Sequence, residues 1–220
     1  MSSFRGVLFD MDGVVLDSET IHAEAETRLL AQFDLDISPD VRSTFKGRSN
    51  VDVFGWVAQE YGDGRVTSDE LILHKQRHMA DLADRLQMID GALDTIRAVH
   101  DAGIAAALVT SSPQTDQQHA FDLFELTDYF QAVVTMDDVT RFKPDPMPYV
   151  AGARLLGLDA SDCVAIEDSV SGIRSAQAAG ARTIGLVGTF DASTLHDAGA
   201  DAVAHSHAEI RVLLGLSETD

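Results

Sequence analysis

The chain has 220 residues, 45% of them hydrophobic, so it can bury a substantial core within one large or two smaller domains. Its formal net charge of −20 argues against nucleic acid and anionic membranes as partners, because both bind basic patches. The sequence contains no apolar run of membrane-spanning length, no visible signal peptide and only one cysteine, so we expect a cytoplasmic protein without an internal disulfide.

Two aspartates end the first expected strand. Residues 7–9 form an apolar run that is too short for a helix, and Asp10 and Asp12 follow it, before Gly13. Two unpaired carboxylates at this point are costly unless a positive group lies between them. The alternative is a turn in which each aspartate bonds its own backbone, as Asp commonly does before Gly. The pattern therefore predicts either a turn or a cation site.

Residues 17–87 differ from the sequence on either side, because they contain helical patterns and no strand pattern. Helices are expected over residues 18–30, 51–60 and 68–87. We therefore predict two domains, a core made of residues 1–16 and 88–220 and an inserted helical domain made of residues 17–87.

From Gly91 onward, strand and helix patterns alternate. Strands are expected at residues 104–109, 132–134, 164–166 and 183–187. Helices are expected at residues 92–101, from residue 112, and at residues 146–156 and 169–179. Such alternation predicts a parallel sheet with helices on both faces. The expected fold class is therefore α/β, with a Rossmann-like core and an inserted all-helical domain.

Polar side chains follow the expected strands at their carboxyl ends, where open parallel sheets bind ligands. Besides the two aspartates, these residues are Thr110, Ser111, Lys143, Glu167 and Asp168. Taken singly, each has a plainer explanation, since hydroxyls cap helices, loop lysines are solvated and acidic residues favour helix starts. Taken together, carboxylates crowded at one edge would repel one another unless a hard cation lay among them, which points to Mg²⁺.

The ordered set Asp10-x-Asp12-Gly13, Thr110, Lys143-Pro144 and Glu167-Asp168 resembles the four motifs of the haloacid dehalogenase-like superfamily. The resemblance covers nearly the whole chain, and the helical insert corresponds to the cap of that superfamily. The stretches 10–18 and 46–49 are similar to the branch that contains beta-phosphoglucomutase and small sugar-phosphate phosphatases. The resemblance therefore implies a phosphatase for a small phosphorylated metabolite, such as a sugar or polyol phosphate.

The resemblance also implies a division of labour between the two aspartates. Asp10 would attack phosphorus and form an aspartyl-phosphate. Asp12 would protonate the leaving oxygen and then take a proton from water. Members of the superfamily that cleave carbon–halogen or phosphonate bonds generally lack an aspartate at the second position, so Asp12 favours phosphate esters.

The remaining core residues receive binding roles from the same resemblance. Mg²⁺ would be held by the Asp10 side chain, the Asp12 backbone carbonyl, Asp168 and Glu167. The phosphoryl oxygens would be held by Thr110, the N–H of Ser111 and Lys143. The implied partner is a small-molecule phosphate ester, and the oligomeric state is unknown, with a monomer as the default expectation.

In the cap, the resemblance implies that His22, Gly47 and Arg48 face the substrate. For His22, a solvent-facing helix histidine is an equal alternative. The arginine that holds a second phosphate in beta-phosphoglucomutase aligns with Asn50, which weakens a hexose-phosphate mutase interpretation, although Arg48 could substitute. A mutase of this type and a catalytically silent regulatory family member therefore stay open as alternatives.

The acidic residues are spread along the chain, and only three of the sixteen cationic residues are lysines. A carboxylate-covered surface of this kind suits high salt, although an ordinary acidic enzyme is the alternative. If the first interpretation holds, the melting temperature will rise between dilute buffer and multi-molar KCl, because salt screens the repulsion among surface carboxylates. A thermal melt in both solutions measures this, and equal or lower stability in KCl would end the high-salt interpretation.

Overall fold

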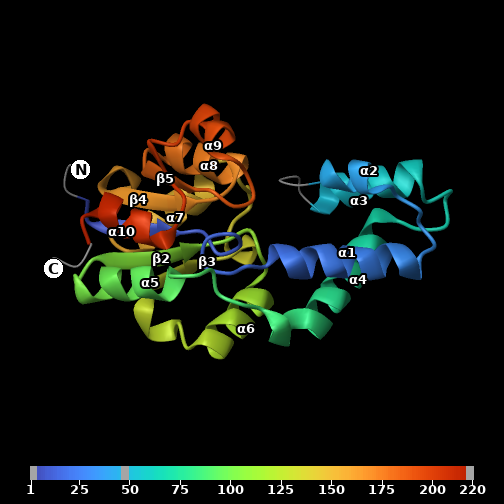
Figure 1. The fold of residues 1–220 in the computed structure, drawn as a ribbon, viewed down its shortest axis with the longest axis horizontal. Coiled ribbons are helices and arrows are strands. Elements are labelled where there is room, and N and C mark those ends of the chain that lie inside the picture. Colours follow the sequence, from blue (N-terminus) through green and yellow to red (C-terminus); the bar gives the residue numbers. More distant parts are fainter. Residues whose placement is uncertain (1–3, 46–49, 217–220) are drawn as a thin grey trace. The chain divides into compact units, whose positions relative to one another are not determined.

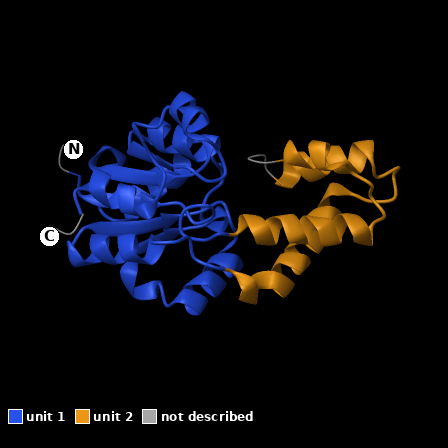
Figure 2. Ribbon diagram, in the orientation of Figure 1, with its two compact units in different colours: residues 1–17, 87–220 blue, residues 18–86 orange. Residues whose placement is uncertain are grey.

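The computed structural model describes residues 4–45 and 50–216 (Figure 1). The chain divides into two compact units, one made of residues 1–17 and 87–220 and the other made of residues 18–86 (Figure 2). We call them unit 1 and unit 2 and describe each by itself. The assignment of unit 1 as a catalytic core and unit 2 as a cap stays a prediction.

Unit 1 is built on a parallel sheet of six strands in the order β3-β2-β1-β4-β5-β6. The strands are β1 (Gly6–Phe9), β2 (Ala105–Val109), β3 (Ala132–Val134), β4 (Cys163–Glu167), β5 (Arg182–Leu186) and β6 (Ala202–Ala204). All four residues of β1 are buried, and β1 pairs with β2 on one side and β4 on the other. The predicted parallel α/β sheet is confirmed, and β6 is a further strand that the apolar pattern does not indicate.

Helices cover this sheet on both faces. The longer helices of unit 1 are α5 (Ala92–Asp101), α6 (Gln114–Phe124), α7 (Met147–Leu155), α8 (Val170–Ala179), α9 (Ala192–Ala198) and α10 (His207–Leu214). Helices α7 and α8 pack against one another and against the central strands, whereas α5 and α10 form a second packed pair. A core of tyrosine, cysteine and aliphatic side chains fills the space between α7, α8 and the sheet.

Local chemistry explains where α8 begins and ends. The Ser169 hydroxyl accepts a hydrogen bond from the backbone N–H of Gly172 at 3.0 Å, which caps the first turn. Gly180 ends the helix with φ of +92°, a conformation that favours glycine. The Ser169 cap places the start of α8 directly after β4, at the carboxyl edge of the sheet.

Within its described residues, the regular secondary structure of unit 2 is helical. It consists of α1 (Glu19–Gln32), α2 (Pro39–Ser43), α3 (Asn50–Glu60), α4 (Ser68–Leu82) and a short 3₁₀ turn (Ala83–Arg85). Helix α4 packs on both α1 and α3 around a core that includes Leu29, Phe54 and Leu71. Among the described residues, no helix combines the length and the apolar composition that crossing a membrane requires.

Candidate active site

A buried cluster forms around Lys143, which lies between β3 and α7, at the carboxyl ends of β1, β2 and β4. Lys143 Nζ donates hydrogen bonds to Asp10 Oδ1 at 2.6 Å, to Glu167 Oε1 at 2.7 Å and to the Val109 carbonyl at 3.0 Å. Only 6% of the Lys143 side chain is exposed, against 10% for Asp10 and 0% for Glu167. The ammonium is therefore enclosed by oxygen atoms from three separate strand ends.

Burial and mutual repulsion set the charge balance of this cluster. Burial, reinforced by the charge of Glu167, raises the pKa of Asp10 above its ordinary value, and Lys143 acts against that rise. The same two causes raise the pKa of Asp168 to about 7. Burial disfavours the charged form of Lys143, but Asp10 and Glu167 outweigh it and raise the pKa of the ammonium. The cluster thus contains one cation and three carboxyl groups, so a further positive charge would be favourable there.

The donor set of this cluster fits a hard divalent cation. Carboxylate oxygens of Asp10, Glu167 and Asp168 lie within 4.8 Å of one another, and all three residues are buried. Oxygen donors with several negative charges suit ions such as Mg²⁺ and Ca²⁺ rather than soft metals. This cluster can therefore bind a metal ion.

Glu167 differs from the other two carboxylates because both of its oxygens are already engaged. Oε1 accepts from Lys143 and from the Tyr149 hydroxyl at 2.7 Å, while Oε2 accepts from the Ser169 hydroxyl at 2.9 Å. The Asp168 carboxylate accepts a very short hydrogen bond from the Thr189 hydroxyl. Glu167 thus orients Lys143, and Asp10 and Asp168 are the better placed of the three to meet a metal directly.

Asp12 lies outside this buried cluster. It is half-buried, and its Oδ2 accepts a hydrogen bond from the Ser112 hydroxyl at 2.7 Å. The backbone N–H of Ser112 in turn donates to Thr110 Oγ1 at 2.9 Å. The loop after β2 therefore ties Thr110 to Asp12 through Ser112, and Asp12 has a more solvated environment than Asp10.

The structure distinguishes the two expected hydroxyl residues of this loop. Thr110 is buried, and α6 begins four residues later with Pro113 at its N-cap, so Thr110 does not cap that helix. Ser111 is exposed. The alternative in which Thr110 serves only as a helix cap therefore does not account for its position.

Several residues that shape the site lie outside the predicted set. Ser112, Tyr149, Ser169 and Thr189 hold the predicted carboxylates in place through their hydroxyl groups. Ser112 and Ser169 directly follow the predicted residues Ser111 and Asp168 in the sequence. Their position next to predicted site residues could have indicated a role in the site. Tyr149 is on a helix and Thr189 in a distant loop, where no sequence spacing connects them with a carboxylate.

The predicted cap residues stay predictions. His22 is a half-buried residue of α1 in unit 2. Gly47 and Arg48 lie outside the described residues. Their relation to the cluster around Lys143 is therefore an expectation from resemblance.

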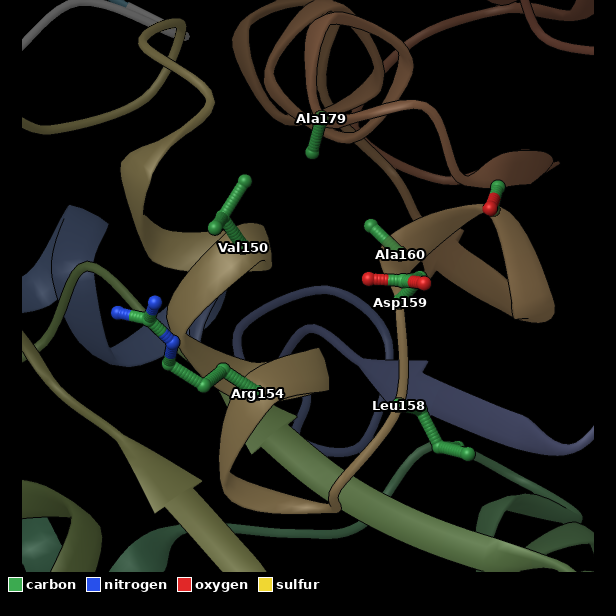
Figure 3. Close-up of a pocket in the computed structure, with 7 residues that line it drawn as sticks. Val150, Arg154, Leu158, Asp159, Ala160 and Ala179 are labelled. Atoms are coloured by element: carbon green, nitrogen blue, oxygen red, sulfur yellow. The ribbon is translucent and has the colours of Figure 1, made fainter.

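A surface hollow in unit 1 is a second place where a ligand could be sought (Figure 3). It is lined by side chains at the end of α7 and in the segment before β4, including Val150, Arg154, Leu158 and Asp159. That segment precedes the amino end of β4, whereas Asp10 follows the carboxyl end of β1. None of the residues that line the hollow belongs to the cluster around Lys143. We therefore take the cluster around Lys143 as the candidate site.

Comparison with known families supports an enzyme. The sequence matches the family of haloacid dehalogenase-like hydrolases over residues 7–186. This range starts within β1 and stops at the end of β5, so it includes every predicted residue of the cluster.

Individual relatives match at moderate identity. A validoxylamine A 7'-phosphate phosphatase from Streptomyces hygroscopicus subsp. limoneus is 28% identical over 94% of this chain and 96% of its own. Hexitol phosphatase B from Escherichia coli strain K12 is 29% identical over 84% of this chain and 85% of its own. A solved HAD family hydrolase from Deinococcus radiodurans R1, with bound phosphate and sodium, is 29% identical, covers 100% of both chains and has a TM-score of 0.79.

Gly172 permits the close approach of α8 to Glu167, because a Cβ at this position would overlap the Glu167 carboxylate. We expect Gly172→Ala to lower the free energy of unfolding by about 1–3 kcal/mol, since the added methyl group must displace a fully hydrogen-bonded side chain. Urea denaturation measures this change.

The matched control is Gly55→Ala in α3, where an added Cβ would meet nothing within 4 Å. There the helix propensity of alanine should raise the free energy of unfolding by about 0.5–1 kcal/mol. Equal stabilisation by both substitutions would contradict the tight packing of Gly172 against Glu167.

Proposed function

The chain belongs to the haloacid dehalogenase-like hydrolase family, and on this basis we propose that it is a Mg²⁺-dependent phosphatase acting on a small sugar or polyol phosphate. The observation that carries the proposal is the enclosure of Lys143 by Asp10 and Glu167 beside Asp168. The names of the two curated relatives, both phosphatases and one a hexitol phosphatase, support the substrate class.

Asp10 is the proposed nucleophile. Its carboxylate attacks phosphorus in line, the P–O bond to the substrate alcohol breaks, and an aspartyl-phosphate forms. Water then attacks phosphorus, releases inorganic phosphate and regenerates Asp10. Lys143, at 2.6 Å from Asp10 Oδ1, fixes the orientation of the carboxylate and favours its ionised form.

Asp12 is the proposed acid and base. It gives a proton to the leaving alcohol oxygen in the first step and takes a proton from the attacking water in the second. Such a role suits a carboxyl group whose environment differs from that of the nucleophile. The half-buried position of Asp12 and its hydrogen bond from Ser112 provide this difference.

Mg²⁺ would be held by the side chains of Asp10 and Asp168 and by the backbone carbonyl of Asp12. When bound, the ion would offset the negative charge of the phosphoryl oxygens and of the carboxylates around it. Glu167 would act through Lys143, which its carboxylate contacts at 2.7 Å. The phosphoryl oxygens would be bound by Thr110, the N–H of Ser111 and Lys143.

One observation in unit 2 weighs against a mutase that would use Lys75 to bind a second phosphate. A mutase must bind a second phosphate in the cap, which requires available positive charge there. The ammonium of Lys75 is buried and donates to Glu26 Oε1 and to Asn50 Oδ1, each at 3.0 Å. This lysine is therefore already neutralised by a carboxylate.

Asp10→Asn tests the enzyme proposal. We expect the purified protein to release phenol from a generic aryl phosphate in the presence of Mg²⁺, and we expect Asp10→Asn to lose at least about 10³-fold of that rate, because the amide is a poor nucleophile. Removal of the metal with EDTA should abolish the rate and added Mg²⁺ should restore it. Equal background rates in both proteins would support the silent regulatory alternative.

The same assay separates phosphatase from mutase when hexose phosphates and polyol phosphates replace the aryl phosphate. We expect release of inorganic phosphate without a sugar bisphosphate activator. Interconversion of isomers without phosphate release would overturn the phosphatase proposal in favour of a mutase.

Ser112→Ala tests the proposed role of Asp12. Loss of the hydroxyl removes the hydrogen bond that orients the Asp12 carboxylate, so we expect kcat to fall about tenfold while KM changes little. Steady-state kinetics on an aryl phosphate measure both constants. Ser161→Ala, at an exposed position in the segment before β4, is the control. A kcat that matches the control would argue against a role for Ser112 in orienting Asp12.

A further inference from the structure

A buried histidine joins the start of α10 to the loop that follows β1. His207 is 1% exposed, and its Nε2 lies 2.8 Å from the carbonyl oxygen of Val14. A carbonyl oxygen only accepts hydrogen bonds, so Nε2 carries a proton and donates it to Val14. In the neutral ring Nδ1 is an acceptor and lies 3.1 Å from Thr95 Oγ1, whose single proton is also within reach of the carbonyls of Gly91 at 3.2 Å and His207 at 3.3 Å. The imidazole thus has a partner at each nitrogen.

The same buried network holds a second chain segment, the one that returns from unit 2. Arg211 Nη1 donates to the Gly91 carbonyl at 3.3 Å and to Thr95 Oγ1 at 3.2 Å. Gly91 has φ of +74°, and a Cβ there would lie 3.1 Å from the Cβ of His207. The backbone of Gly91 therefore packs closely against the Cβ of His207, where a larger residue would be crowded.

The loop that His207 holds is the loop that carries Asp12. The N–H groups of Val15 and Leu16 both donate to the Met11 carbonyl at 2.9 Å, and Gly13 N–H donates to the Leu16 carbonyl at 2.8 Å. The return segment joins this loop, since Ile89 N–H donates to the Val15 carbonyl at 3.0 Å. A tight turn therefore encloses Asp12, and a displacement of Val14 would be transmitted to it.

We propose that His207 is a positioning residue for Asp12, which fixes the loop of residues 12–16 by binding the Val14 carbonyl. Through Thr95 and Arg211, the same network fixes Gly91, so the outgoing and returning segments of unit 1 are anchored at one buried point. The inference rests on the proposed function only for the role of Asp12. The anchoring of the loop is independent of any activity.

Acid should lower the stability of the fold around His207, because a buried imidazole resists protonation. Burial, reinforced by the charge of Arg211, lowers the pKa of His207, while the Val14 carbonyl, Asp90 and Asp94 act in the opposite direction. The ring is therefore neutral in the folded protein, and the unfolded chain binds a proton more readily. Stability from the neutral ring is present above the ordinary histidine pKa of about 6.5 and is lost as the pH falls below it.

His207→Phe and His207→Gln test the proposal together. Phenylalanine removes the donor to Val14, so we expect faster hydrogen exchange at the amides of residues 15 and 16, with kcat about tenfold lower and KM little changed. Glutamine keeps an N–H that can reach Val14 and does not titrate. We expect His207→Gln to keep most of the wild-type kcat and most of the amide protection. Its free energy of unfolding should also fall less than that of the wild type between about pH 7.5 and about pH 5.5.

His205→Gln, at an exposed histidine next to α10, is the control.

Each outcome decides the proposal. Wild-type exchange and wild-type kcat in His207→Phe would overturn it, and faster exchange with an unchanged kcat would overturn the positioning of Asp12. If His207→Phe does not fold, Thr95→Val replaces it, because it removes the hydroxyl that binds His207 and Arg211 and should also speed exchange at residues 15 and 16. If the protein hydrolyses no phosphate ester, the proposed function fails, whereas the exchange measurements still test the anchor.

Discussion

A single buried ammonium, that of Lys143, holds the carboxyl edge of the sheet together. It hydrogen bonds to the side chain of Asp10, which follows β1, and to the side chain of Glu167 at the end of β4. It also hydrogen bonds to the carbonyl of Val109 at the end of β2. These carboxylates lie too close together to stay buried and charged without a cation between them. Removal of one partner from such a buried pair typically costs about 3–5 kcal/mol, because the other charge loses its compensation. The position of Asp10 therefore depends on Lys143 as much as on β1.

The carboxylates around Lys143 are chemically unequal, and their hydrogen bonds make them so. Glu167 accepts hydrogen bonds from Lys143, Tyr149 and Ser169, so both of its carboxylate oxygens bind and orient protein groups. Asp10 has a single partner among the hydrogen bonds described above, and Asp168 has Thr189. The proposed division into a nucleophile, a metal ligand and an orienting carboxylate follows from these contacts. Asp12 has a different partner, the hydroxyl of Ser112 from the neighbouring loop.

Sequence patterns predicted those parts of the molecule that depend on local chemistry. The bounds of α5 and β3 agree with the predicted ranges, and α8 ends before Gly180 as expected, since apolar runs and terminal glycines mark these elements directly. The predicted ranges omit β6, α9 and α10, although Gly199 and Gly215 end the two helices in the left-handed conformation. In the site, order along the chain indicated which strand ends carry polar groups. The contacts of Ser112, Tyr149 and His207 could not be predicted, because tertiary packing joins residues that are distant in sequence.

The position of β1 in the middle of the sheet constrains how the protein can be made. During synthesis from the amino terminus, β1 is complete after residue 9, but its partners β2 and β4 begin only at residues 105 and 163. Unit 2, which lies between β1 and β2 in the chain, has a core of its own and can collapse in the meantime. The strand that leads to Asp10 therefore lacks its partner β2 until the chain has been made to residue 105, and its partner β4 until residue 163. Such long-range pairing slows folding and leaves an apolar segment exposed to aggregation while the chain is being made.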